Sequence, residues 1–163
     1  MRILFAIALA LAALPGAVLA QTSVALGSLE HDTSLPVEVT SDSLEVSNEA
    51  GLASFLGNVV VIQGPMRLAA AKIDVRYSDD GTGSNDIDEM FASGGVTFTN
   101  GTDAAESKEA TYNPDTAMLV MKGDVVLTQG PSVMSGQVLT VDLGAGTGAM
   151  EGRVRTVFQT GNQ

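Results

Sequence analysis

The acidic stretch 79–89 holds the densest group of possible metal ligands in this chain. Its aspartates, which include Asp79, Asp80 and Asp86, could bind calcium through carboxylate and backbone oxygens. The stretch lacks the EF-hand spacing with its terminal glutamate, and it matches a calcium-binding nonapeptide repeat only once, where such repeats come in tandem. A solvated loop between two strands is therefore favoured, and the sequence leaves calcium binding open.

The sulfur and imidazole side chains do not form a recognisable site. The chain has no cysteine, and its one histidine, His31, stands in a polar segment without a partner ligand. Copper carriers cluster methionines beside histidine or cysteine, whereas here the methionines are dispersed among strand-like apolar residues and fit an adaptable apolar lining better. A general base or nucleophile would have to be a carboxylate, and the carboxylates alternate along strands as an outer face requires. We expect no active site, no cofactor and no resident metal. The methionines after the first are Met66, Met90, Met118, Met121, Met134 and Met150.

A glycine-rich segment, Val-Asp-Leu-Gly-Ala-Gly-Thr-Gly at 141–148, is the most misleading motif. Taken alone it resembles the cofactor loop of S-adenosylmethionine-dependent methyltransferases. Such a loop needs a following helix and further βα units. Few residues follow, and they include Gly152 and the strand-like run 154–158. The segment is therefore predicted to be a hairpin turn.

A degenerate internal repeat organises the chain that carries these residues. Its signature, Gly-x-Val-x-apolar, begins at Gly57, Gly94 and Gly123, and the first and third copies continue into Gln-Gly-Pro at 63–65 and 129–131. Self-similarity at roughly 30–40 residues marks stacked units that bury their apolar faces only against their neighbours. We expect an elongated β structure with a continuous apolar interior, suited to holding or relaying something rather than to housing one catalytic pocket.

The repeat also indicates which side of each strand faces inward. Among the residues that follow each Gly-x pair, only the first and third stay apolar in all three copies. Alternate residues of a strand point to opposite faces. The predicted interior set is therefore Val59, Val61, Val96, Phe98, Val125 and Leu127, whereas Val60, Ile62 and Val126 belong to the other face.

Strand and turn signals alternate from Pro36 onward. The segments 37–40 and 44–47 have period-2 alternation, and glycine, Asn-Pro and Gly-Pro signals recur roughly every 8–12 residues. This spacing predicts many short strands in a sandwich or roll. The segment 66–77 is the best helix candidate, but its repeat mate 132–143 is rich in valine and threonine with a central glycine. Both segments are therefore predicted to be strands.

The ends of the chain and its composition limit the possible domain boundaries and the possible partners. Residues 1–20 carry an early positive charge, an apolar run shorter than the about 20 residues of a membrane span, and a small-residue cleavage pattern. They are predicted to be a cleaved signal peptide, 21–35 a flexible leader, and 36–163 one domain. A net charge of −11 without a basic stripe makes nucleic acid a poor partner. An exported chain without cysteine suits a Gram-negative periplasm.

Several motifs along the chain match one known family. They are Pro-Val-Glu-Val at 36–39 with Ser41-Asp42 next, Gly-Asn-Val-Val-Val-Ile-Gln-Gly at 57–64, Ala-Lys-Ile at 71–73 and a second Gly-Asp-Val block at 123–125. With these motifs the chain resembles the OstA-like, or LptA, family of periplasmic bridge proteins of lipopolysaccharide transport. The same module also occurs in a membrane-anchored partner and in an outer-membrane translocon. Without a retained anchor or a barrel, the chain is expected to be the bridge.

The resemblance implies an all-β fold, an open-ended twisted antiparallel β-jelly roll, with lipopolysaccharide acyl chains in its apolar interior. It also implies a periplasmic location and partners among the inner-membrane-anchored and outer-membrane components of the transport machinery. Val37, Val39, Val59 and Val61 match interior positions of the family. The predicted lipid-binding groove comprises Val37, Val39, Leu44, Val46, Phe55, Val59, Val61, Ile73, Val75, Val96, Phe98, Tyr112, Val125, Leu127, Leu139 and Val141.

The two ends of such a roll differ in charge. An open roll leaves an unpaired strand at each end, and unpaired edges recruit other strands. The N-terminal edge, 37–46, carries three acidic residues, and the C-terminal edge, 153–158, carries two arginines. Opposite charges predict a head-to-tail homo-oligomer. The predicted self-assembly edge residues are Val37, Val39, Arg153, Val154, Arg155 and Val157.

Two hypotheses of other classes stay open. One is a structural exported β-roll protein, such as a filament or surface-layer subunit, with a packed core and no lipid cargo. The other, weaker hypothesis is an enzyme that acts on periplasmic glycans through carboxylates. Lipid bound to the purified protein would favour the bridge hypothesis. A solid core would favour the structural protein, and paired inward-facing carboxylates in a cleft would favour the enzyme.

Overall fold

Among the residues that the structure describes, all of the regular structure consists of strands. The structure is a computed structural model that describes residues 22–25, 32, 34–47, 51–78 and 86–158. These residues include no helix that is long and apolar enough to cross a membrane. The strands are β1 Thr22–Ala25, β2 Glu38–Thr40, β3 Ser43–Ser47, β4 Leu52–Gln63, β5 Met66–Tyr77, β6 Ile87–Asn100, β7 Asp103–Asn113, β8 Met118–Gln129, β9 Ser132–Asp142, β10 Thr147–Glu151 and β11 Arg155–Val157.

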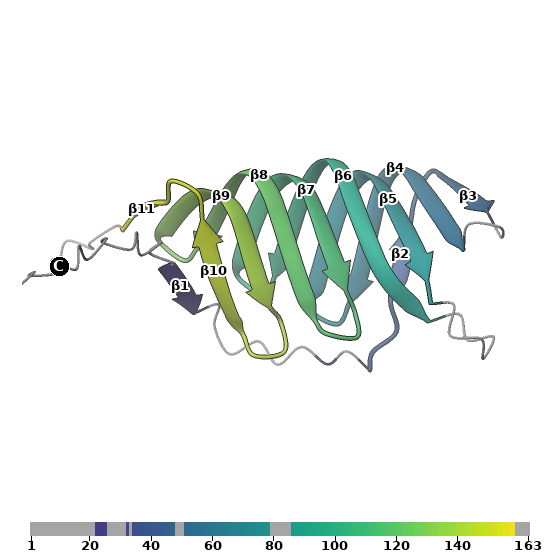
Figure 1. Ribbon diagram of the computed structural model, residues 1–163, viewed down its shortest axis with the longest axis horizontal. Helices are drawn as coiled ribbons and strands as arrows, with labels where there is room; N and C mark the ends of the chain where they lie inside the picture. Colours follow the sequence, from purple (N-terminus) through teal and green to yellow (C-terminus); the bar gives the residue numbers. More distant parts are fainter. Residues whose placement is uncertain (1–21, 26–31, 33, 48–50, 79–85, 159–163) are drawn as a thin grey trace, which may run out of the picture.

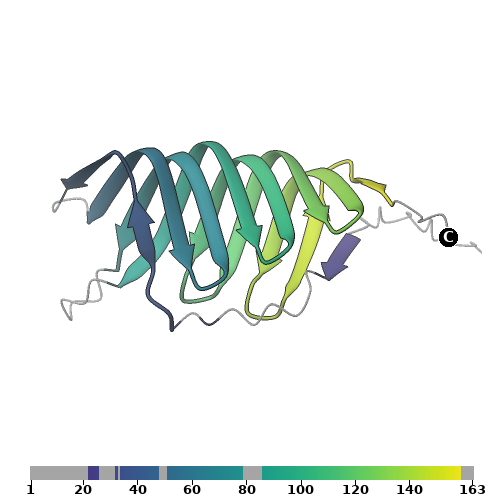
Figure 2. The ribbon, with the colours of Figure 1, turned by 180° about the vertical axis from the view of Figure 1, so that it is seen from behind.

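The strands form a single antiparallel sheet that curls over on itself. Neighbours follow the order β1-β10-β9-β8-β7-β6-β5-β4-β2, with β3 also paired to β4 and β11 also paired to β9. In Figure 1 each long strand rises on one side, bends over a ridge and descends on the other, and Figure 2 shows the same roll from behind. The expected all-β fold, an open-ended twisted antiparallel β-jelly roll, is confirmed.

The ridge is made by the Gly-x pairs of the repeat. Strand register shifts across the pairs that begin at Gly57, Gly94 and Gly123, and each of these glycines has a positive φ, of 77°, 81° and 85°. Such a β-bulge bends a strand and strengthens its twist, so the ladder can turn a corner without ending. A Cβ on Gly94 would lie 2.7 Å from the Cβ of Ala71, which leaves no room for a side chain.

A fourth copy of the Gly-x pair lies at Gly152-Arg153. Its φ angles are 82° and 50°, close to the 77° and 46° of Gly57-Asn58. A Cβ on Gly152 would meet the Cβ of Gln137 at 2.6 Å. The ridge therefore extends to the C-terminal end of the roll, beyond the three copies that the sequence pattern reveals.

The long strands correct the prediction of many short ones. Strands β4 to β9 run for 11 to 14 residues each, with the repeat glycines inside them rather than between them. A bulge keeps the ladder continuous, so these glycines do not separate strands. The helix candidate at 66–77 and its repeat mate are strands, β5 and β9, as predicted.

The ridge divides the long strands into two facing layers. We call them layer A and layer B. Layer A contains 59–63, 66–70, 96–100, 103–107, 125–129 and 132–136, and layer B contains 52–56, 72–77, 87–93, 109–113, 118–122 and 138–142. The edge opposite the ridge consists of the turns that connect strands within each layer. We call it the open edge.

Rows of paired apolar residues fill the space between the layers. Residues paired across neighbouring strands point to the same face, so a chain of pairs marks a row. The row of layer A is Val39, Val61, Leu68, Phe98, Ala105, Leu127 and Met134. The rows of layer B are Leu44, Phe55, Ile73, Ala92, Ala110, Met121, Leu139 and Met150, and Val46, Ala53, Val75, Met90, Tyr112, Leu119 and Val141.

Part of the expected flexible leader 21–35 forms a strand instead. Residues 22–25 are β1, which pairs with β10 from Thr22↔Met150 to Ala25↔Thr147. An edge strand offers unpaired backbone groups to any chain that reaches it, so this pairing needs no apolar pattern. The predicted signal peptide 1–20 lies outside the described residues, and so does His31.

Candidate functional site

The structure places most residues of the predicted groove inside the roll. Eleven of them are buried in one core between the layers, and Val37, Val39 and Phe55 are partly buried against it. Whether these residues contact a lipid stays a prediction. The buried members are Val59, Val61, Ile73, Val75, Val96, Phe98, Tyr112, Val125, Leu127, Leu139 and Val141.

The opposite strand face is exposed, as the repeat indicates. Ile62 and Val126 are among the large apolar side chains at the surface, and Val60 is half-buried. The inward phase deduced from the repeat therefore agrees with the observed burial. The Gly-x pair sets this phase, because each strand leaves the bulge with its first residue pointing inward.

Leu44 and Val46 are the members of the predicted groove that lie open to solvent. Leu44 pairs with Phe55 and Val46 with Ala53, so both belong to the inward-facing rows. Their side chains are nevertheless 53% and 62% exposed. The reason is that β3 is the last strand at its end of layer B, with no further strand to cover it. The apolar interior is therefore accessible at this end.

Several interior residues escaped the sequence prediction. Leu68, Leu119, Ala92 and Ala105 are buried in the same rows, and their positions follow from the alternation of β5 to β8. Methionine lines the interior, as the dispersed pattern indicates. Met66, Met90, Met121, Met134 and Met150 are all buried.

The polar residues of the open edge were also missed. Among the described residues, the buried polar side chains are Gln63, Asn100 and Asp103. Gln63 ends β4 and accepts a hydrogen bond of 2.7 Å on Oε1 from the Tyr112 hydroxyl, while its Nε2 donates to the Leu35 carbonyl at 3.0 Å. Burial raises the pKa of Tyr112 to about 12. This hydrogen bond ties layer A to layer B.

Asn100 ends β6 at the equivalent place and lacks such a bond. It is 1% exposed, and neither its Nδ2 nor its Oδ1 has a hydrogen-bond partner. The neighbouring Gln129 instead reaches Asp103, with 3.3 Å between Nε2 and Oδ2. A shared signal could have revealed this row, because an amide precedes glycine in each turn of layer A, at 63–64, 100–101 and 129–130.

A small cavity opens beside Asn100. Its volume is about 10 Å³, which is enough for one water-sized group. It lies where the turn after β6 faces the turn after β9. The lining residues are Phe98, Asn100, Asp103, Leu127, Leu139, Val141, Asp142, Leu143 and Gly146.

The glycine-rich segment 141–148 is a hairpin turn, as predicted. It joins β9 to β10, and Asp142 Oδ1 accepts a hydrogen bond of 2.8 Å from the Ala145 backbone N–H. A side chain that accepts from a backbone N–H a few residues on stabilises such a turn. The segment therefore leads into a strand rather than into a cofactor-binding helix.

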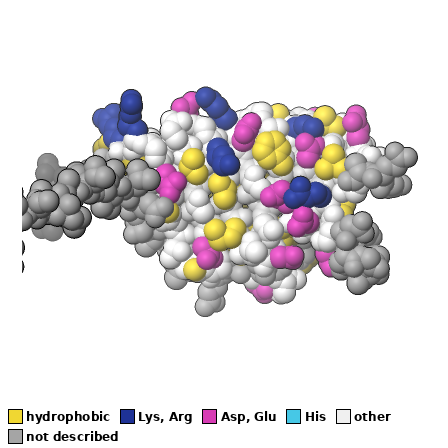
Figure 3. All heavy atoms as spheres, in the orientation of Figure 1, with side chains coloured by type: hydrophobic (Ala, Val, Ile, Leu, Met, Phe, Trp, Pro, Cys, Tyr) yellow, Lys and Arg dark blue, Asp and Glu magenta, His cyan; other side chains and the backbone are white. Residues whose placement is uncertain are grey.

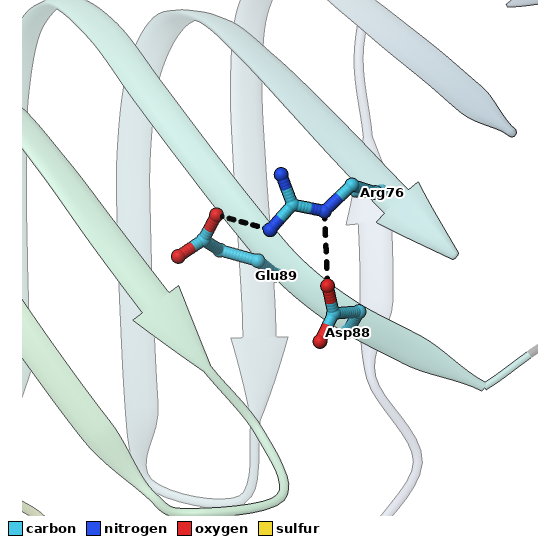
Figure 4. A network of polar contacts seen from close by, with 3 residues as sticks. All are labelled: Arg76, Asp88 and Glu89. Atoms are coloured by element: carbon cyan, nitrogen blue, oxygen red, sulfur yellow. Dashed lines mark hydrogen bonds and ion pairs between the residues drawn. The ribbon is translucent and has the colours of Figure 1, made fainter. Parts of the chain in front are cut away.

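The described part of the acidic stretch forms ion pairs. Arg76 Nε lies 2.9 Å from Asp88 Oδ2, and its Nη2 lies 2.8 Å from Glu89 Oε2, as Figure 4 shows. Residues 79–85 lie outside the described residues. Within the part that the structure describes, no three acidic or histidine side chains are grouped to hold a metal ion. The carboxylates of Asp88 and Glu89 thus form surface ion pairs that link β6 to β5.

The predicted assembly residues lie at opposite ends of the roll. Val39 is in β2, which pairs with β4, and Val37 comes just before this strand. Arg155 and Val157 are in β11, which pairs with β9 at the other end. The charged side chains of the face in Figure 3 are mixed in sign, with basic groups prominent toward the C-terminal end. Arg153 is exposed and Val154 packs partly against the core.

Comparison with known proteins adds the family context. The family model described as "LptA/(LptD N-terminal domain) LPS transport protein" matches residues 38–147. An uncharacterised protein of Rhizobium meliloti is 33% identical over 148 residues, which cover 85% of this chain and 80% of that protein. The lipopolysaccharide export system protein LptA of Haemophilus influenzae is 25% identical over 121 residues, which cover 71% of this chain and 70% of that one.

A solved structure has the same fold. It is LptH, the LptA-homologous periplasmic component of the lipopolysaccharide transport device of Pseudomonas aeruginosa. The two structures superpose with a TM-score of 0.70 at 17% identity, and the match covers 80% of this chain and 99% of that chain. At this identity the likeness concerns the fold.

Proposed function

Because the chain belongs to the LptA/LptD N-terminal domain family of lipopolysaccharide transport proteins, we propose that it is a periplasmic bridge that carries lipopolysaccharide from the inner to the outer membrane. It is a transport protein rather than an enzyme. The observation that carries the proposal is the set of apolar rows, which run from β3 to β10 between the two layers. Such rows offer a lipid one continuous apolar path.

Acyl chains would occupy the space between the layers. Each buried methylene contributes about 0.8 kcal/mol, so partly buried chains bind without any contact to the headgroup. The cavity beside Asn100 holds about 10 Å³, far less than an acyl chain needs. The chains must therefore enter by spreading the layers at the open edge.

Spreading the layers does not require strand pairing to break. The ladders run within each layer and continue over the ridge, and the layers meet at the open edge through side chains. The hydrogen bond from Tyr112 to Gln63 is such a contact. An opening about the ridge would admit acyl chains and let them leave again, which transport demands.

End-to-end assembly would extend the path across the periplasm. Among the described residues, β2 and β3 each pair along one edge only, with β4. At the other end, β11 pairs along one edge only, with β9. Glu38, Asp42 and Glu45 are exposed at the first end, and Arg153 and Arg155 at the other. Opposite charges favour a head-to-tail register with another copy or with the membrane components of the machinery.

One observation favours the structural alternative. The interior is closely filled by side chains, as expected of an exported β-roll protein that holds no cargo. The two proposals differ in what the purified protein retains. Native mass spectrometry of protein isolated from lipopolysaccharide-producing cells should reveal bound lipopolysaccharide, which gentle collisional activation releases. Protein that never carries lipid, even after incubation with excess lipopolysaccharide, would favour the structural alternative.

A further inference from the structure

The buried side-chain amide of Asn100 makes no hydrogen bond that would stabilise the fold. The residue ends β6 in the turn that leads to β7, and it is 1% exposed. Its Nδ2 and Oδ1 both lack a hydrogen-bond partner. Buried polar side chains almost always find partners, because burying an unpaired amide costs free energy. An exception of this kind calls for an explanation.

The neighbouring turns show that the fold itself does not need an unpaired amide here. Gln63 occupies the corresponding place at the end of β4, and its Oε1 accepts the Tyr112 hydroxyl. Gln129 occupies it at the end of β8 and donates to Asp103. Each of these amides is used within the protein. Asn100 alone among these three turn amides presents both of its polar atoms unpaired to the interior.

The surroundings of Asn100 define what it could bind. Phe98, Leu127 and Leu139 line the adjoining cavity, so most of a ligand at this place would be apolar. The free volume of about 10 Å³ suits one oxygen-sized group. Asp103 and Asp142 are among the residues that line the same cavity, so a phosphate or another anion would meet negative charge there. The ligand is therefore an apolar chain that carries a small neutral polar group.

We propose that Asn100 recognises the hydroxyl group of a hydroxylated acyl chain bound between the layers. This inference rests on the proposed function and names the chemistry of part of its cargo. A hydroxyl can donate to Oδ1 while it accepts from Nδ2, so one small group satisfies both atoms of the amide. The amide thereby sets the depth at which the chain lies, because the hydroxyl must reach the open edge between the turns after β6 and β9.

The test compares two neutral ligands that differ only in this group. Methyl 3-hydroxymyristate and methyl myristate compete with a fluorescent fatty acid for the purified protein, for Asn100→Leu and for Thr99→Val. Thr99 is the neighbouring residue on the other strand face and serves as the matched control. The wild-type protein and Thr99→Val should bind the hydroxylated ester about five- to tenfold more tightly. Asn100→Leu should lose this preference and bind the two esters with equal affinity.

Thermal unfolding without ligand gives an independent outcome. Leucine has nearly the shape of asparagine and no unpaired polar atoms, so Asn100→Leu should raise the Tm by a few degrees. A lower Tm would mean that a structural water or another group already satisfies the amide, and the inference would be wrong. A hydroxyl preference retained by Asn100→Leu would overturn it as well. If neither ester binds the wild-type protein, the proposed function itself fails.

Discussion

The two ends of the roll differ in how far they cover the apolar interior. At the end formed by β2 and β3, Leu44 and Val46 continue the rows of layer B yet are mostly exposed. At the end formed by β10, Met150 closes one of these rows and is fully buried. The outer edge of β10 is in turn paired with β1. The interior is thus accessible at one end and covered at the other.

This difference gives the roll a direction. A strand that binds at the β3 end would form backbone hydrogen bonds and would also cover the exposed side chains of Leu44 and Val46. A strand arriving at the other end meets β11, whose Val157 pairs with Val133 on the outer face. Symmetric joining of two like ends would bring equal charges together. The asymmetry therefore supports a head-to-tail order.

The largest expected effect comes from charging the accessible end. The double variant Leu44→Lys, Val46→Lys removes two exposed apolar groups and places positive charge at the end that would meet Arg153 and Arg155. We expect end-to-end association to weaken by about a hundredfold. Sedimentation velocity across a concentration series measures this loss. Because both side chains are mostly exposed, the Tm should stay nearly unchanged. Association as strong as that of Phe91→Lys, Val126→Lys, a control that charges two exposed apolar positions of β6 and β8 away from both ends, would show that this end is not the junction.

The ridge should tolerate change at its end better than at its middle. In the Gly94→Ala variant the new Cβ meets Ala71 at 2.7 Å with a positive φ, between strands that are paired on both sides. We expect the free energy of unfolding to fall by about 3 kcal/mol. Gly152→Ala has a similar clash beside the short β11, which can detach, so about 1 kcal/mol is expected.

Chemical denaturation measures both ridge variants. Gly95→Asn is the control, because no atom lies within 4 Å of a Cβ at that position and Asn58 adopts the same region of φ in the first repeat. Because a φ of 87° is strained even for asparagine, it should lower the free energy of unfolding by about 1 kcal/mol, well below the cost of Gly94→Ala. If Gly94→Ala and Gly152→Ala lowered the free energy of unfolding equally, the middle and the end of the ridge would not differ in their tolerance of substitution.

Uncovering the closed end should have a moderate effect. Deleting residues 22–25 removes β1 and frees the outer edge of β10 for pairing. We expect self-association to strengthen about fivefold, because a second free edge adds backbone partners at this end. Light scattering at matched concentrations would show the increase. A decrease would mean that β1 belongs to the junction rather than covering it.

The smallest effect concerns the hydrogen bond that ties the layers between the two ends. Burial raises the pKa of Tyr112 to about 12, above its ordinary value of 10.0. The folded state therefore favours the neutral phenol, and the stability it contributes is fully present below pH 10 and lost as the pH rises toward 12. The Tyr112→Phe variant should be slightly less stable at neutral pH and should lose less stability between pH 10 and 12. Parallel alkaline profiles for the two proteins would refute this role.

The sequence predicts the interior well because packing repeats. Three copies of the Gly-x-Val signature constrain the phase of β4, β6 and β8, and the burial of Val59, Val96 and Val125 follows from it. The corner at each Gly-x pair is harder to foresee. A glycine inside an apolar run is equally consistent with a turn and with a bulge, and only the pairing on both sides distinguishes them.

Two features depend on contacts that leave little trace in the sequence. Strand β1 forms through backbone pairing with β10, which requires no apolar alternation in residues 22–25. The burial of Asn100 arises because two turns from different layers face each other, whereas an Asn-Gly pair alone indicates an exposed turn. The exposure of Leu44 and Val46 likewise reflects their place at the end of the stack.

Photo-crosslinking at adjacent positions of β6 tests the central claim most directly. A photoreactive amino acid replaces either Phe98, which is buried between the layers, or Thr97, which is exposed on the other face. Cells that produce lipopolysaccharide are irradiated, and the crosslinked protein is detected with an antibody to the lipid. We predict strong crosslinking from position 98 and only background from position 97. Equal crosslinking from both positions, or none from position 98 in a folded protein, would contradict transport through the apolar interior.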